Sequence, residues 1–178
     1  MNRAEEISLV QQVTVFHDQR AFGMLMREYQ SPVRRFLLSQ TLGDSQLSDD
    51  LAQDTFVKAY THIDQFQGKS SFLTWLFRIA YNVFYDYVRG RKSTLDLETT
   101  AVRGKYSERI DSTLRMDIYE ALQLLNHSER VCITLQLMEG QPIDKISAIT
   151  EIPENTVKSH LARGKKKMAN FLRANGYG

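Results

Sequence analysis

Cysteine is almost absent from this sequence of 178 residues, which contains only Cys132. A single cysteine cannot form an internal disulfide, and no group of histidines and cysteines has the spacing of a structural zinc site. Long apolar runs are also missing, although about 18 consecutive apolar residues are needed to span a membrane. The first ten residues carry Glu5 and Glu6 and no apolar signal core. We therefore expect a protein of the reducing cytoplasm that is neither exported nor inserted in a membrane and that binds no metal.

Signatures of catalysis are missing as well. The sequence has no glycine-rich phosphate-binding loop and no paired-carboxylate motif, and its four histidines are scattered at His17, His62, His127 and His160. No set of nucleophile, base and oxyanion-binding group is evident. We expect neither an enzyme nor a cofactor-binding protein, and we interpret each histidine as a surface or capping residue.

Strand-like alternation of apolar and polar residues is absent, and helical periodicity dominates. In the first half, Asp18 can cap a helix, and Pro32 is expected to start a short segment after it. A further helix is predicted to open at Ser48, followed by a loop over residues 64–70 and a helix over residues 72–89. The predicted fold class is all-α.

The helical period lapses over residues 90–112, which are rich in threonine, serine and charge. A structureless stretch of this length inside one compact domain is improbable, so it indicates a linker. We therefore expect two small helical domains, residues 1–90 and residues 113–178, joined by a flexible linker over residues 91–112.

The second domain is predicted to end in a helix-turn-helix. Asn126 and Glu129 can form a capping box for a helix that ends at Gly140, and Pro142 suits the first position of a short helix. A turn over residues 150–153 then leads into a long helix. A short helix, a tight turn and a longer helix with a polar outer face are typical of DNA-binding domains.

Charge is distributed unevenly, although the net charge is only +2. Residues 44–64 hold five acidic residues and one basic residue, whereas residues 155–178 hold six lysines or arginines and no acidic residue. A plain solvated face is the ordinary explanation of either pattern. Because Val57 faces outward on the acidic helix, we expect a protein partner there, and nucleic acid on the basic helix.

The last helix separates into an apolar stripe and a basic face. On the basic face, Arg163 can make a bidentate contact to guanine, Ser159 can hydrogen-bond to a base or a phosphate, and Lys158 and Lys166 can neutralise phosphates. Gly164 lies in the apolar stripe although glycine costs a helix about 1 kcal/mol relative to alanine. We hypothesise that a neighbouring helix approaches closely there.

The helix over residues 72–89 is unusually rich in aromatic residues, most of which must belong to a core. Its projection leaves one narrow exposed strip, which contains Trp75, Arg78, Asn82, Tyr85, Asp86 and Arg89. Aromatic rings beside arginine and asparagine can stack on and pair with unpaired bases. The strip is therefore a candidate site for single-stranded nucleic acid.

Three ordered stretches of the chain resemble bacterial sigma factors of the extracytoplasmic-function group. They are residues 51–60 (LAQDTFVKAY), residues 66–82 (FQGKSSFLTWLFRIAYN) and residues 155–163 (NTVKSHLAR). The resemblance covers nearly the whole chain apart from the linker. It implies two helical domains that correspond to sigma regions 2 and 4, and no chemistry by the sigma factor itself. The partners implied are core RNA polymerase, promoter DNA and an anti-sigma factor.

The resemblance also implies roles for individual residues. Asp50, Gln53, Asp54 and Val57 would dock on the clamp of the largest polymerase subunit. Phe66 and Ser70 in the loop, with Asn82, would capture a flipped base of the downstream (minus-10) element, while Trp75, Arg78 and Arg89 would hold the melted strand. The upstream (minus-35) element would be read by Asn155, Thr156, Lys158, Ser159, Ala162, Arg163 and Lys166.

Two other classes of protein remain open. Residues 156–161 also resemble the recognition helices of regulators that carry a helix-turn-helix output domain, although the first 90 residues lack the alternating strands of a receiver domain. A helical adaptor that binds only proteins would leave the acid-free basic face unexplained. Affinity for core RNA polymerase separates the three classes.

Overall fold

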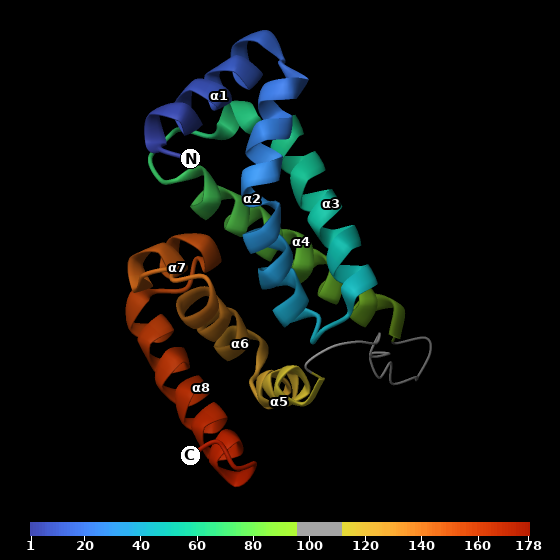
Figure 1. The fold of residues 1–178 in the computed structure, drawn as a ribbon, viewed down its shortest axis with the longest axis vertical. Helices are drawn as coiled ribbons and strands as arrows, with labels where there is room; N and C mark the ends of the chain where they lie inside the picture. The colour runs from blue at the N-terminus through green and yellow to red at the C-terminus, as the bar shows by residue number, and fades with distance from the viewer. Residues whose placement is uncertain (96–111) are drawn as a thin grey trace. The chain divides into compact units, whose positions relative to one another are not determined.

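The computed structural model describes residues 1–95 and 112–178, so most of the predicted linker lies outside the described residues. Within those two ranges the chain forms eight α-helices, a 3-10 turn and a π-turn, and no strand (Figure 1). The all-α prediction is confirmed.

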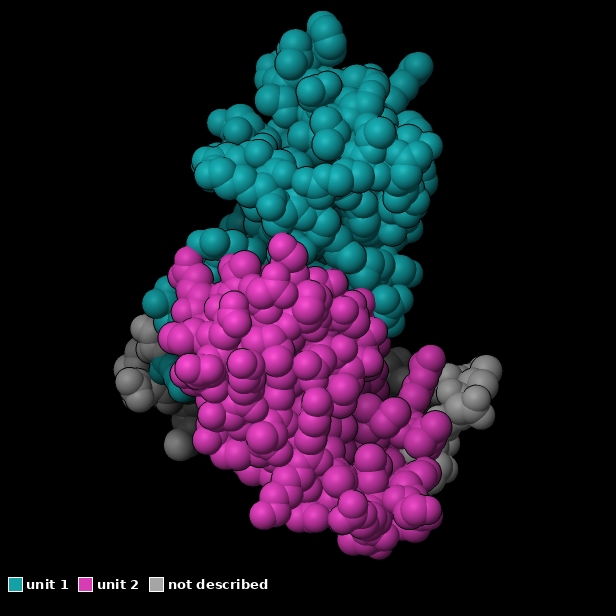
Figure 2. Space-filling view, turned by 90° about the vertical axis from the view of Figure 1, so that its left-hand side faces the viewer, with its two compact units in different colours: residues 1–35, 49–99 teal, residues 36–48, 100–178 magenta. Residues whose placement is uncertain are grey.

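Two compact units divide the chain, and they do not follow it in order (Figure 2). Unit 1 comprises residues 1–35 and 49–99, and unit 2 comprises residues 36–48 and 100–178. Within unit 2, Gln40 Nε2 donates a hydrogen bond to Thr134 Oγ1 at 3.2 Å, which ties residues 36–48 to the rest of that unit. The division into domains of residues 1–90 and 113–178 stays a prediction.

Unit 1 begins with α1 (Arg3–Phe16) and the first part of α2 (Gln19–Gln40). Asp18 caps α2 as predicted, because its Oδ1 accepts hydrogen bonds from two backbone N–H groups of the first turn. The prediction that Pro32 starts a separate segment is wrong, since α2 runs through it without a break. Proline removes one helical hydrogen bond. The adjacent Val33 is fully buried, and its packing favours continuation of the helix.

The third helix, α3 (Ser45–Thr61), starts earlier than the predicted Ser48. Its cap is Asp44, whose Oδ1 accepts a hydrogen bond from the backbone N–H of Leu47 at 3.0 Å. The buried Ser48 instead donates its hydroxyl to the Asp44 carbonyl at 2.6 Å inside the first turn. Both residues are good caps, and burial of Ser48 selects the earlier one.

A 3-10 turn, η1 (Ile63–Gln65), and a loop over residues 66–71 connect α3 to α4 (Phe72–Leu95). The last helix of unit 1 is therefore longer than predicted, and residues 91–95, which the sequence placed in the linker, are helical. The core of unit 1 draws on all four helices; its buried side chains include Leu9, Val13, Leu25, Val33, Leu51, Phe56, Ala59, Phe72, Leu76, Phe77 and Ala80.

Unit 2 contains α5 (Ser112–Gln123), α6 (His127–Ile133), the π-turn η2 (Thr134–Met138), α7 (Ile143–Thr150) and α8 (Glu154–Ala174). Its core includes Ala121, Leu122, Leu125, Val131, Cys132, Ile133, Leu135, Ile146, Ile149, Val157 and Leu161. The order of α7, a short turn and α8 is the predicted helix-turn-helix.

Local signals identify the ends of these helices, although Pro142 lies one position away from the predicted one. The capping box at α6 is confirmed, because Asn126 accepts from the Glu129 N–H at 2.9 Å and Glu129 accepts from the Asn126 N–H at 3.1 Å. Gly140 follows η2 with φ of +65°, a conformation that glycine adopts without strain. Pro142 lies one position before the first residue of α7, as its N-cap.

Candidate nucleic-acid and polymerase interfaces

The outer face of α8 is open to solvent. All seven residues predicted to read the upstream element are exposed: Asn155, Thr156, Lys158, Ser159, Ala162, Arg163 and Lys166. On the opposite side of the helix, Val157, Leu161 and Gly164 are buried. The polar face that a major-groove contact requires is therefore displayed by the second helix of the helix-turn-helix.

Gly164 sets the spacing between α8 and α6. A Cβ atom at this position would lie 2.7 Å from Cγ1 and 3.2 Å from Cδ1 of Ile133. Carbon atoms that are not bonded do not approach so closely, so only glycine lets the helices pack at this distance. The hypothesis of a close helix approach at Gly164 is confirmed.

The basic face has an acidic neighbour from another helix. Glu129 of α6, with a side chain only 1% exposed, accepts a hydrogen bond from Lys167 Nζ at 2.8 Å and pairs with Arg163 Nε at 3.5 Å. Burial alone raises the pKa of this carboxyl. The hydrogen bonds from Lys167 and the Asn126 backbone, with the charges of Lys167 and Arg163, outweigh burial and hold the pKa of Glu129 below its ordinary value. The group is therefore a carboxylate at neutral pH.

Arg163 is held from a second side by His160, whose Nδ1 lies 3.1 Å from Arg163 Nη2. Desolvation, and then the charge of Arg163, lower the pKa of His160. The imidazole is therefore neutral near pH 7, and in the tautomer with an unprotonated Nδ1 it accepts a hydrogen bond from the guanidinium. Because the Arg163 side chain remains 56% exposed, it is oriented by both partners and still accessible to DNA.

The strip predicted on α4 is exposed. Arg78, Asn82, Tyr85, Asp86 and Arg89 face solvent, and Trp75 is half-buried. The Arg89 guanidinium lies over the Tyr85 ring, 5.1 Å from its centroid, and donates to Asp86 at 3.1 Å. Arginine, amide and aromatic groups thus share one surface, as stacking on and pairing with unpaired bases requires.

The loop over residues 66–71 joins this strip at its start. The Phe66 ring packs against Phe72 and Trp75, with centroid separations of 5.4 and 5.5 Å. Ser70 is half-buried and donates its hydroxyl to the next carbonyl at 3.2 Å. The structure therefore brings Phe66 and Trp75 together, and it places Asn82 farther along the exposed side of α4.

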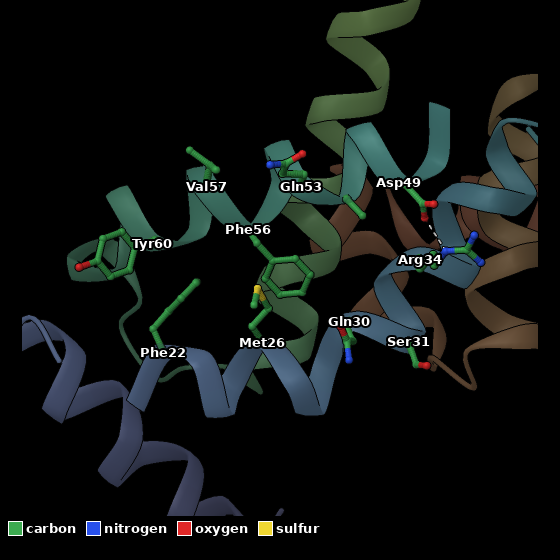
Figure 3. A pocket seen from close by; sticks show the side chains of 11 residues that line it. Phe22, Met26, Gln30, Ser31, Arg34, Asp49, Gln53, Phe56, Val57 and Tyr60 are labelled. Carbon is green, nitrogen blue, oxygen red and sulfur yellow. Dashed lines mark hydrogen bonds and ion pairs between the residues drawn. The ribbon is translucent and has the colours of Figure 1, made fainter. Parts of the chain in front are cut away.

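The four residues predicted to bind polymerase, Asp50, Gln53, Asp54 and Val57, are all exposed on α3. A groove of about 600 Å³ lies beside them, between α3 and α2 (Figure 3). Its lining is Phe22, Met26, Gln30, Ser31, Arg34, Asp49, Ala52, Gln53, Phe56, Val57 and Tyr60. An ion pair between Arg34 and Asp49 lies at one end of the groove, and the Phe22 and Tyr60 rings, 5.0 Å apart, lie at the other.

Comparison with known proteins decides among the classes left open by the sequence. The ECF RNA polymerase sigma-E factors of Escherichia coli (strain K12) and Salmonella typhimurium (strain LT2) are each 30% identical to this chain over 168 residues, which is 86% of the chain and 87% of the relative. The chain belongs to the extracytoplasmic-function sigma factors. The family of Sigma-70 region 2 matches residues 25–94 of this sigma factor, and the family of Sigma-70, region 4 matches residues 115–168.

Solved structures agree with this assignment. The sigma factor RpoE of Bartonella quintana, in a co-crystal with the anti-sigma factor NepR, matches with a TM-score of 0.72 and 26% identity over 85% of this chain and 96% of its own. CnrH matches with a TM-score of 0.73 at 24% identity, which supports the fold alone. This sigma factor thus binds core RNA polymerase and directs transcription initiation at promoters. In the part of the chain that the structure describes, no helix could cross a membrane.

Sequence reasoning missed the contribution of α2 to the groove. On that helix the Met26 side chain remains 38% exposed, whereas that of its neighbour Leu25 is fully buried. The apolar stripe of α2 is wider than the part of the helix that packs in the core, and this excess of apolar residues is a signal that could have indicated the groove. The capping role of Glu129 followed from the sequence, but its ion pairs did not, because their partners Arg163 and Lys167 lie in a different helix.

Proposed function

We propose that this sigma factor uses three separate surfaces during initiation. The exposed face of α3, with the groove beside it, binds the clamp of core RNA polymerase. The α4 strip with the loop over residues 66–71 captures and holds the melted minus-10 strand, and α8 reads the minus-35 element in the major groove. The division of the chain into region 2, linker and region 4 belongs to the same proposal, as does a cytoplasmic location.

The α4 strip is the observation that carries this proposal. Aromatic, cationic and amide groups face solvent on a helix whose opposite side is buried, and a packed core alone does not require that arrangement. Phe66 and Trp75 supply ring surfaces beside the loop, and Asn82 supplies a donor and an acceptor for a base edge. The sigma factor performs no chemistry in this scheme; the polymerase does.

We further propose that an anti-sigma factor restrains this protein. The support is the relative from Bartonella quintana, which was crystallised with its anti-sigma factor NepR. An inhibitor that covers the α3 face would compete directly with the polymerase. Such a partner would bury exposed apolar groups, and the Val57 side chain on that face is 57% exposed.

Binding to purified core RNA polymerase tests the role of α3. Val57→Asp is expected to weaken the affinity about tenfold, because a charge would be buried in the interface. The matched control is Val15→Asp on α1, where valine is 64% exposed and no contact with polymerase is proposed. Equal affinities for the two variants would reject the α3 surface, and a wild-type protein with no affinity for core would reject the whole scheme.

Replacing Asn82 separates promoter opening from polymerase binding. Asn82→Ala is expected to slow open-complex formation on duplex promoters by about tenfold, because the captured base loses its hydrogen bonds. Affinity for core should not change, since Asn82 lies on α4 and not on the α3 face. Run-off transcription is compared on duplex and pre-melted templates. An identical defect on both would show that Asn82 has no part in opening.

A further inference from the structure

Neighbouring residues restrain the two ends of the loop over residues 66–71. At its start, the Phe66 ring is packed against Phe72 and Trp75. At its end, the Ser71 Oγ accepts from the Thr74 N–H at 3.1 Å and so caps α4. These contacts are local, and they fix the two ends of the loop without fixing its middle.

The middle and the end of the loop are held by α1. Arg3 Nη2 donates to the Gly68 carbonyl at 2.8 Å, and Glu6 Oε1 accepts from the Phe72 backbone N–H at 3.1 Å. The partners in these two bonds are 65 and 66 residues apart in the sequence. The first helix therefore reaches across to the loop at two points.

Glu6 is itself fixed in place. The residue is only 6% exposed, and its second oxygen, Oε2, accepts a hydrogen bond from the Tyr29 hydroxyl. Burial, and then this hydrogen bond, raise the pKa of Tyr29 above its ordinary value, so that the hydroxyl remains a donor. A buried carboxylate is costly unless its oxygens are bonded, and here both are, at the positive end of α4.

Gly68 is the point at which the loop could most readily change shape. Its φ of +67° lies in the left-handed region, where glycine is tolerated and has many alternatives. A hydrogen bond to its carbonyl selects one orientation of the peptide. A site that is ordered before it binds loses less entropy on binding, and therefore binds more tightly.

We propose that α1 is a positioning element, in which Arg3 and Glu6 hold the loop over residues 66–71 in the shape that receives the flipped base. The proposal rests on the base-capture role of this loop and Asn82 given above. It assigns a function to residues that precede the part of the chain matched by Sigma-70 region 2, which begins at residue 25.

The first measurement uses Trp75, the only tryptophan of the chain, as a probe, because its ring packs against Phe66 of the loop. Arg3→Ala and Glu6→Gln are compared with Arg20→Ala, which removes an exposed cation from α2. Acrylamide quenching of Trp75 fluorescence should increase in the first two variants and not in the third. Unchanged quenching in Arg3→Ala would overturn the proposal even if Glu6→Gln fails to fold.

The second measurement concerns DNA. Holoenzyme is bound to fork-junction DNA from a promoter that it transcribes in run-off assays, with an abasic site introduced at each position of the single strand in turn. The wild-type protein should lose affinity sharply at one position. Arg3→Ala should reduce that preference by about three- to tenfold, with the melting midpoint and core affinity unchanged.

The outcomes separate the two ideas. If the wild-type protein shows no position-dependent loss, base capture itself is wrong and the positioning role falls with it. If the wild-type protein discriminates and Arg3→Ala discriminates equally, base capture stands and positioning by α1 is wrong. A variant that lowers the melting midpoint without changing the ratio of affinities for intact and abasic DNA would likewise show a structural role only.

Discussion

Glu129→Ala is expected to lower the free energy of unfolding of unit 2 by about 2–3 kcal/mol, a large share of the stability of a small domain. The substitution removes one half of the capping box of α6 and the carboxylate that pairs with both Arg163 and Lys167 of α8. Loss of a cap alone costs about 1 kcal/mol. The rest comes from Lys167 and Arg163, which are left without their counter-charge. They are 45% and 56% exposed, so water recovers part of the loss.

Denaturant unfolding measures this loss of stability, and amide hydrogen exchange shows which helices are affected. Protection should fall in α6 and α8 and should not change in α4, which belongs to the other unit. Glu120→Ala is the matched control, because Glu120 is an exposed glutamate on α5 of the same unit. A control that destabilises unit 2 as much as Glu129→Ala would show that the position of Glu129 between the two helices has no special importance.

The pH dependence of stability tests the role of Glu129 a second time, with a different substitution. The folded protein holds the pKa of Glu129 below the value in the unfolded chain, so the unfolded chain binds a proton first as the pH falls. The contribution of Glu129 is therefore complete above the ordinary pKa range of a glutamate and is lost as the pH falls through the folded pKa. Glu129→Gln should therefore flatten the acid limb of the stability curve relative to the wild-type protein, when the free energy of unfolding is measured at a series of pH values.

Helix ends could be predicted where a local sequence signal determines them. The prediction failed where the burial of neighbouring side chains determines them. The Asp18 cap and the capping box at Asn126 follow from residues two to three positions apart, and both were found from the sequence. Pro32 and Ser48 carry equally good local signals for a helix start. Each lies inside a longer helix, because the packing of neighbouring side chains overrides a local preference of about 3 kcal/mol at Pro32 and about 1 kcal/mol at Ser48.

The exposed faces of α3, α4 and α8 were predictable for a related reason. A helix repeats every 3.6 residues, so the pattern of apolar residues identifies the outward positions before any tertiary contact is known. The restraints behind those faces were not predictable. Glu129 meets Lys167 across 38 residues, and Arg3 meets Gly68 across 65, and no periodicity in either segment marks the partner.

Gly164→Leu is expected to destabilise unit 2 by more than about 3 kcal/mol, because α8 would have to move away from α6. Even the single methyl group of alanine would lie 2.7 Å from Cγ1 of Ile133. Gly164→Ala should therefore cost about 1 kcal/mol, since an overpacking penalty of about 1–3 kcal/mol exceeds the gain in helix propensity of about 1 kcal/mol.

Gly23 provides the matched control in the other unit. It also lies inside a helix, but a Cβ there would meet only Arg27 Nη1, at the ordinary distance of 3.7 Å. Gly23→Ala should raise the free energy of unfolding by up to about 1 kcal/mol through helix propensity. The same substitution is thus expected to have opposite signs at the two glycines, and equal signs would contradict the packing argument.

A double-mutant cycle then tests whether Ile133 is the group that Gly164 accommodates. Ile133→Ala alone should cost about 2–5 kcal/mol, because it opens a cavity in the core of unit 2. In the double variant Gly164→Ala, Ile133→Ala the new methyl group at position 164 occupies part of that cavity. The double variant should therefore lose about 1 kcal/mol less stability than the sum of the losses in the two single variants. Strict additivity would mean that α8 is positioned by other contacts. Coupling would show that this one close approach sets where Arg163 and the rest of the outer face stand relative to α6.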